Sequence, residues 1–175
     1  MKKIYLYTTA CLFFLLGALQ MNAQITVAGA IGGKSGTYAS LTGNGVNPNA
    51  GGGVFAALNS VAQTTANITI TFTGNTTENG NNALGNGAWN SISMVSNAAI
   101  VRNITGTVAN GMIRFNGADK VTIDGRFAGT GNYLSISNTS TSNNTGSSTI
   151  MFFNDATNNT ITNCTILGSS TGAVT

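Results

Sequence analysis

The residues that could most readily bind a ligand lie near the N-terminus, in the stretch AGAIGGKS from Ala28 to Ser35. An alanine, four intervening residues and then Gly-Lys-Ser match the loose form of a phosphate-binding loop, in which loop amides and a lysine hold nucleotide phosphates. Such a loop works at the start of a helix that follows a strand. Here Gly43, Pro48 and a glycine triplet follow too soon for a long helix. We therefore expect no nucleotide site.

Acidic residues are too few and too scattered for a hydrolytic or lyase site. The chain has no histidine, and its carboxylates are Glu78, Asp119, Asp124 and Asp155. Asp119 and Asp124 are the nearest pair, but an extended strand would separate them by about 17 Å, which is too far for paired catalytic carboxylates. We interpret them as a turn residue and a strand-end residue, and we expect Glu78 to be solvated in a loop. The sequence predicts no catalytic residue, no metal site and no cofactor.

Residues 1–23 have the pattern of a secretory signal. Lys2 and Lys3 precede an uncharged apolar run from Ile4 to Leu19, and Ala23 is a small residue suited to cleavage. A membrane anchor is the alternative, but the run is shorter than the roughly 20 residues that a membrane span needs. We expect cleavage near Ala23 and a protein that is secreted or held at the outer cell surface.

Removal of that signal leaves a nearly neutral chain. The net charge of +3 includes Lys2 and Lys3, so five basic and four acidic residues remain. No basic surface is left to follow a phosphate backbone, and we expect no nucleic acid partner. Cys164 is then the remaining cysteine. It lies in a strand-like stretch, and we interpret it as a small buried apolar group.

Alternating hydrophobicity predicts short β-strands. The stretches NITITFTG, KVTIDG, YLSISN and NTITN set apolar residues on one face and polar residues on the other. Clusters of Gly, Asn and Ser separate them, as turns require. Residues 51–66 are the exception, because helical spacing relates their apolar residues Val54, Phe55, Leu58, Val61 and Ala62. They predict one amphipathic helix of about nine or ten residues, placed as a lid over one end of a β core.

An internal repeat indicates how the strands are arranged. IRFNGADKVTIDG, from Ile113, aligns without gaps on MFFNDATNNTITN, from Met151, at a separation of 38 residues. The alignment predicts a structural ladder of three like pairs: Phe115 with Phe153, Asn116 with Asn154, and Ile123 with Ile161. Both copies have the pattern strand, polar turn, strand. Stacked coils of a solenoid would explain this, with the asparagines forming an amide ladder. A β-sandwich with coincidental similarity is the alternative.

The stretches GGVFAALNS, NITITFTGNTTE, IRFNGADKVTIDG and GTGNYLSISN resemble the N-terminal region of large secreted proteins of Bacteroidota. The resemblance covers roughly residues 51–175. It implies a right-handed parallel β-helix of the pectate-lyase-like type, export by the type IX route, and an adhesin-like role in surface attachment or polysaccharide contact. The chain departs from the family where its pattern stops at GSSTGAVT, without a closing cap or a sorting domain. We therefore expect a fragment.

These observations predict an all-β chain with four segments: signal peptide 1–23, N-terminal loop region 24–50, capping helix 51–66, and β-helix coils 67–175 that are incomplete at the C-terminus. The expected function is a non-catalytic structural or adhesive module at the cell surface. The alternative is the N-terminal fragment of a β-helix polysaccharide lyase or glycoside hydrolase. Expected partners are extracellular polysaccharide, other surface proteins, or a second copy bound through an uncapped C-terminal coil. Trp89 and Tyr133 are the candidate glycan contacts.

Overall fold

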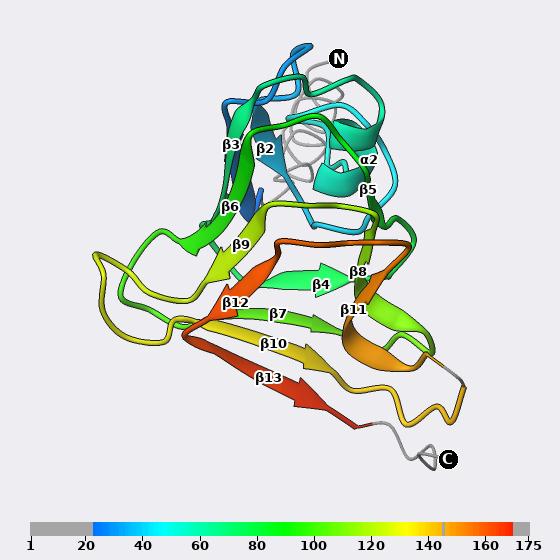
Figure 1. Ribbon diagram of the computed structural model, residues 1–175. Helices are drawn as coiled ribbons and strands as arrows, with labels where there is room; N and C mark the ends of the chain where they lie inside the picture. The colour runs from blue at the N-terminus through cyan, green and yellow to red at the C-terminus, as the bar shows by residue number, and fades with distance from the viewer. Residues whose placement is uncertain (1–22, 145, 170–175) are drawn as a thin grey trace, which may run out of the picture.

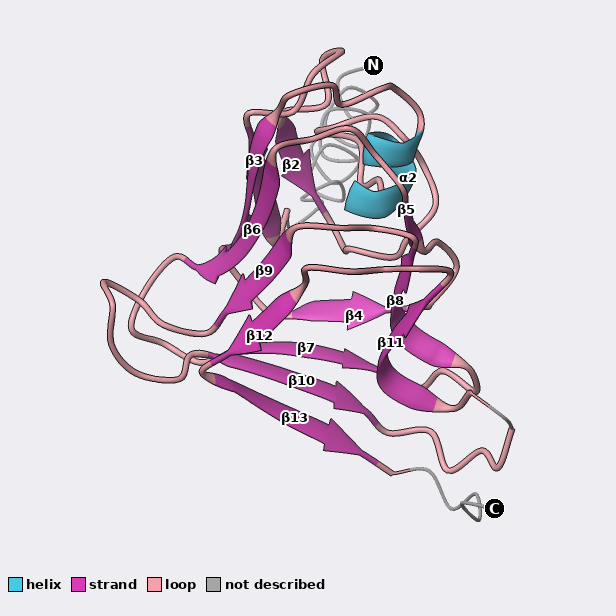
Figure 2. Ribbon diagram, viewed as in Figure 1, coloured by secondary structure: helices cyan, strands magenta, loops and turns pink. Residues whose placement is uncertain are grey.

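The computed structural model describes residues 23–144 and 146–169 (Figure 1). The expected signal segment, apart from Ala23, lies outside these ranges. The secondary structure of the described residues consists of short β-strands and the helix α2 (Val54–Asn59), joined by long loops (Figure 2). No helix of these residues is long and apolar enough to cross a membrane. The fold is therefore all-β, with parallel sheets.

The strands form three sheets. The six-stranded sheet has the order β12-β9-β6-β3-β1-β2, with β1 (Ile25–Ala28), β2 (Gly36–Tyr38), β3 (Asn67–Phe72), β6 (Ser91–Ser96), β9 (Val121–Asp124) and β12 (Thr160–Thr162). The four-stranded sheet has the order β13-β10-β7-β4, with β4 (Thr76–Glu78), β7 (Arg102–Gly106), β10 (Leu134–Asn138) and β13 (Cys164–Gly168). The three-stranded sheet has the order β11-β8-β5, with β5 (Leu84–Gly85), β8 (Gly111–Asn116) and β11 (Ser148–Phe153).

From β3 onward, three consecutive strands supply one strand to each sheet, and we call such a group a triplet. The triplets are β3–β5, β6–β8 and β9–β11, and β12 and β13 begin the next. Strands of successive triplets pair in parallel in every sheet. The spacing is irregular: in the six-stranded sheet, paired residues lie 24 (Asn67 and Ser91), 29 (Ile92 and Val121) and 38 positions apart (Ile123 and Ile161). Loops absorb the differences while the strands stay in register.

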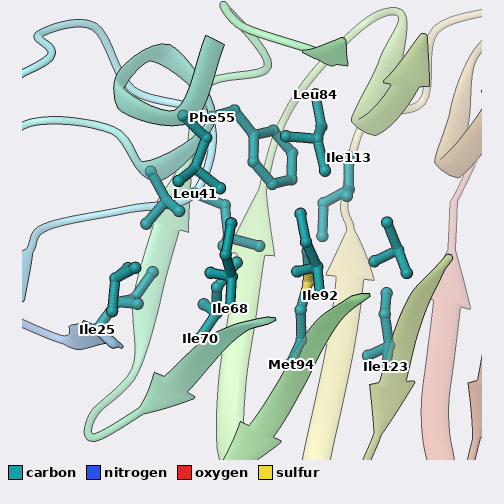
Figure 3. Close-up of a cluster of buried hydrophobic side chains, with 14 of the residues drawn as sticks. Ile25, Leu41, Phe55, Ile68, Ile70, Leu84, Ile92, Met94, Ile113 and Ile123 are labelled. Atoms are coloured by element: carbon teal, nitrogen blue, oxygen red, sulfur yellow. The ribbon is translucent and has the colours of Figure 1, made fainter. Parts of the chain in front are cut away.

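Alternate positions of the strands meet in one hydrophobic core (Figure 3). Ile70, Met94 and Ile123 stand opposite one another on β3, β6 and β9, and all three are buried. The four-stranded sheet adds Ile104 and Ile136 in the same way. Burying one such side chain contributes about 1.5–3 kcal/mol. These columns of apolar side chains therefore hold successive triplets together.

The N-terminal end of this core is covered by a lid, made of β1, β2, residues 39–53 and helix α2 (Val54–Asn59). Strand β1 pairs antiparallel with β3, and β2 pairs antiparallel with β1. The outer edge of β2 is occupied in turn, because Asn49 N donates to Thr37 O at 2.7 Å and Ala39 N donates to Gly52 O at 3.2 Å. Helix α2 lies beside β5 (Figure 1). The lid thus leaves no open strand edge among the described residues of β1 and β2.

Helix α2 is shorter than the sequence predicts. It ends at Asn59, because both the amide and the hydroxyl of Ser60 donate to Ala57 O, at 3.2 and 2.7 Å, and so close the last turn. Asn59 then anchors the helix to β5 by donating to Ala83 O and accepting from Gly85 N. Val61 and Ala62 lie beyond the helix, so the predicted length was wrong.

The ungapped alignment was also wrong for one strand pair. Phe115 stands opposite Phe152, not Phe153, and their rings stack with centroids 5.0 Å apart. The separation between β8 and β11 is therefore 37 residues, one less than in the following strands. The extra residue is Asn154, which follows β11 in the left-handed conformation, at φ 52°. Its side chain still donates to Asn116 Oδ1 at 2.7 Å, and Ile123 stands opposite Ile161.

Candidate functional site

The loop that matches a phosphate-binding motif joins two antiparallel strands. It follows β1, and β2 begins at Gly36, where a nucleotide-binding fold would begin a helix. Lys34 Nζ donates to Val46 O at 2.9 Å, and Ser35 Oγ donates to Ala30 O and accepts from Ala30 N. Lys34 therefore binds this loop to Val46 of the lid, and Ser35 closes the loop on Ala30.

Glu78 is a buried carboxylate that sequence reasoning placed in solvent. It is 2% exposed at the end of β4. Its Oε1 accepts from Leu41 N at 3.1 Å, and its Oε2 accepts from both Thr42 N and Thr42 Oγ1 at 2.8 Å. The Thr42 hydroxyl also accepts from the amides of Asn79 and Gly80. The carboxylate and this hydroxyl tie the lid to the first triplet. The strand Thr76–Glu78 has the sequence TTE and contains no apolar residue. The hydrophobic pattern therefore could not indicate that Glu78 faces inward.

The two aspartates flanking β9 are both occupied by local hydrogen bonds. Asp119 Oδ1 accepts from the amide of Thr157 and from its hydroxyl, and these bonds lower the pKa of Asp119. Asp124 forms a bidentate ion pair with Arg126, at 2.7 Å between Oδ2 and Nη2, which lowers the pKa of Asp124. A general acid in glycoside cleavage needs a raised pKa. Both carboxylates are shifted in the opposite direction.

Of the two aromatic candidates for glycan contact, Trp89 is not available as a stacking platform. It is 3% exposed, and its Nε1 donates to Asp119 O at 2.6 Å. Gly87 lies against the ring so closely that a Cβ there would stand 2.0 Å from Cζ3. Trp89 lines a hollow of about 220 Å³ beside Asn59 and Gln63, but it does so from within the core. The structure therefore places this candidate glycan contact in the core.

Tyr133 is partly exposed in the loop between β9 and β10. Gly131, at φ +82°, lies under its ring, where a Cβ would stand 2.2 Å from Cε2. The backbone carbonyl of Tyr133 accepts from Arg102 N at 2.8 Å, which fixes this loop to the second triplet. One side of the ring is thus covered by the chain itself.

Cys164 is partly buried at the start of β13. Its thiol lies 3.2 Å from Thr162 O, to which it can donate, and desolvation raises its pKa to about 11. The thiol is therefore protonated at neutral pH, and a protonated thiol is a poor nucleophile and a poor metal ligand. Within the described ranges, no three His, Cys, Asp or Glu side chains lie together as possible metal ligands.

A row of hydroxyl groups crosses the outer face of the six-stranded sheet. It runs over β3, β6, β9 and β12 at one register position, as Thr69, Ser93, Thr122 and Thr160. We call these four residues the hydroxyl row. All four are at least partly exposed, and within the described chain none of their hydroxyls has a hydrogen-bond partner. Neighbouring strands stand about 4.8 Å apart, so the hydroxyls form a regular line.

Other polar side chains join successive triplets to each other. Besides Asn154 and Asn116, these contacts are Ser91 Oγ to Asn67 Oδ1 at 3.2 Å, Thr107 Oγ1 with Thr139 Oγ1 at 2.7 Å, and both polar side-chain atoms of Asn138 with the backbone of Val108 at 2.9 Å.

Comparisons of the chain with protein-family models, with curated proteins and with solved structures gave no match.

Proposed function

We propose that the chain is a non-catalytic extracellular module, structural or adhesive, built as a right-handed parallel β-helix. The observation that carries this proposal is the triplet order: each triplet supplies one strand to each of three sheets, and successive triplets pair in parallel throughout. In a β-helix each coil would be one such triplet, stacked only on its neighbours. Apolar columns inside and polar contacts outside would make the stack a stiff rod.

The use of the carboxylates supports a structural role. Glu78 binds the lid, Asp119 binds the next turn through Thr157, and Asp124 binds Arg126. Three of the four acidic side chains thus satisfy a neighbouring donor. A carboxylate that acts as an acid or a nucleophile has to face the substrate instead.

The hydroxyl row is the surface on which we place glycan contact. Its hydroxyls are free of protein partners within the described chain, and they can both donate to and accept from sugar hydroxyls. The corresponding row on the four-stranded sheet is less suited to glycan contact. There Thr105 Oγ1 donates to Thr76 O at 3.3 Å, and Leu167 occupies the last position, opposite Ser137. An uncharged row fits neutral polysaccharides better than acidic ones.

Affinity electrophoresis in gels that contain neutral polysaccharides tests this proposal. The unchanged chain should be retarded in at least one of them. A variant with Ser93→Val and Thr122→Val should lose that retardation, and the matched variant with Thr105→Val and Ser137→Val should keep it. Equal behaviour of the two variants would contradict the assignment of the surface. Release of sugar products by the unchanged chain, lost in an Asp119→Asn or Asp124→Asn variant, would overturn the non-catalytic role.

Export is proposed from the residues that precede the described chain. Protein recovered from outside the cell should begin at Gln24, because signal peptidase cuts after a small residue such as Ala23. N-terminal sequencing of secreted material measures this. An intact Met1 on extracellular protein would contradict the proposal.

A further inference from the structure

The last described strands present an open face, which we call the end face: the outer edges of β11, β12 and β13, with the side chains beside them. These are the terminal strands in the order of their sheets, so one backbone edge of each is unpaired within the described chain. Phe152 is 43% exposed and Ile166 is 45% exposed. Their partners one triplet earlier, Phe115 and Ile136, are fully buried. Among the described residues, the core columns therefore run out onto this face without a cover.

The end face also lacks the charges that normally block edge-to-edge pairing. Residues 146–169 carry one charged side chain, Asp155, and it lies in the turn between β11 and β12. Native sheet edges are usually protected by lysine, by proline or by inward-pointing charges. Here Cys164, Thr165, Ile166 and Leu167 make up an uncharged edge strand of high β-propensity. Such an edge can accept another strand without burying a charge.

The other end of the molecule cannot supply that strand. The lid closes the N-terminal end, because β1 and β2 run antiparallel there and residues 49–52 occupy the outer edge of β2. There the lid also bonds to Glu78 at the end of β4, and Asn59 of helix α2 bonds to Ala83 O and Gly85 N at β5. The end face has no such cover among the described residues, so it is the edge that a second copy can offer. We propose that two copies of this chain associate tail to tail through their end faces, as a closed twofold dimer. This rests on the strand edges and not on the glycan contact proposed above.

A twofold axis through the middle of β13 makes this pairing self-complementary. It sets β13 antiparallel to its own copy, with Ile166 near the axis, and a twofold interface uses the same residues on both copies. Antiparallel pairing satisfies the open amides and carbonyls, and it covers the exposed ends of the core columns. A hollow of about 270 Å³ beside Thr149 and Gly168 opens near the end of β13 and offers room for side chains of the partner.

Sedimentation of the chain purified from an exporting host, at several concentrations, tests the proposal. The unchanged chain should approach about twice the mass of one chain and stop there. Ile166→Lys should remain monomeric, because two lysines would meet at the axis. Ile100→Lys is the matched control: Ile100 is 59% exposed in the loop between β6 and β7, away from the end face, and this variant should dimerise like the unchanged chain.

Cross-linking separates the dimer from a folding defect. With Cys164 replaced by Ser, the variant Leu167→Cys should be joined into a dimer by a short bis-maleimide, because Leu167 is exposed on β13. Asn47→Cys, on the exposed lid, should not be joined. A monomer at every concentration would overturn the proposal, as would a mass that rises without limit or a dimer that survives Ile166→Lys.

Discussion

The carboxylate of Glu78 accepts from three donors of the lid: the amides of Leu41 and Thr42, and the hydroxyl of Thr42, which otherwise reaches Asn79 Oδ1 at 3.5 Å. Removing a buried acceptor leaves its donors unsatisfied. Glu78→Ala should therefore lower the free energy of unfolding by about 3 kcal/mol, and Glu78→Gln by about 1 kcal/mol because one acceptor oxygen remains. Urea titration measures both. Asp155→Asn is the control: it removes a carboxylate at an exposed turn position with φ 60° and keeps a residue type that tolerates this conformation, so it should change stability by less than about 0.5 kcal/mol.

Cys164 gives a second test at the scale of one side chain. With a thiol pKa of about 11, alkylation of the folded chain from Gln24 onward should be slow at pH 8 and should accelerate as the pH approaches that value. Unfolding in urea should restore the reactivity of an ordinary thiol, whose pKa is 9.0. Between these two values the unfolded state loses the proton and the folded state keeps it, so stability should fall as pH rises. Rapid alkylation of the folded chain at pH 8 would show that the thiol is not desolvated.

Among the secondary-structure elements, helix α2 shows how the lid is attached. Phe55 is fully buried, and its ring lies 6.0 Å from that of Phe115 on β8. Phe55→Ala should therefore cost about 4 kcal/mol of unfolding free energy. Phe127→Ala makes the same chemical change at a residue that is 39% exposed in the loop between β9 and β10, and it should cost about 0.5 kcal/mol or less. Similar losses in thermal unfolding for both variants would mean that the helix does not seal the core.

The register between β8 and β11 can be tested with a double-mutant cycle. Phe115 stacks on Phe152, and such aromatic pairs contribute about 1 kcal/mol beyond their burial. Replacing both residues by leucine should therefore show a coupling energy of that size. The cycle between Phe115 and Phe153 should show almost none, since Phe153 stands opposite Asn116. A larger coupling to Phe153 would restore the ungapped alignment.

For the whole molecule, strands could be predicted from the sequence wherever alternation was strict. NITITF and LSISN alternate without a break, and both form strands with Ile70 and Ile136 facing the core. The register between β8 and β11 could not be predicted, because one left-handed residue, Asn154, shifts it and leaves no mark in the hydrophobic pattern. The burial of Glu78 could not be predicted for another reason: it depends on amides that lie 36 and 37 positions earlier in the chain.

The lid also determines the order in which this chain can fold. A polypeptide that emerges N-terminus first presents β1 before β3, and β3 then offers an edge to β6 only 24 residues later, counted between Asn67 and Ser91. Each new strand thus finds a template already in place, although the 24 to 38 positions between paired residues of β3, β6, β9 and β12 still have to be closed, and long-range β pairing is slow in general. Folding can advance one triplet at a time behind the point of emergence, and under a pulling force the strands farthest from the lid should be the first to detach.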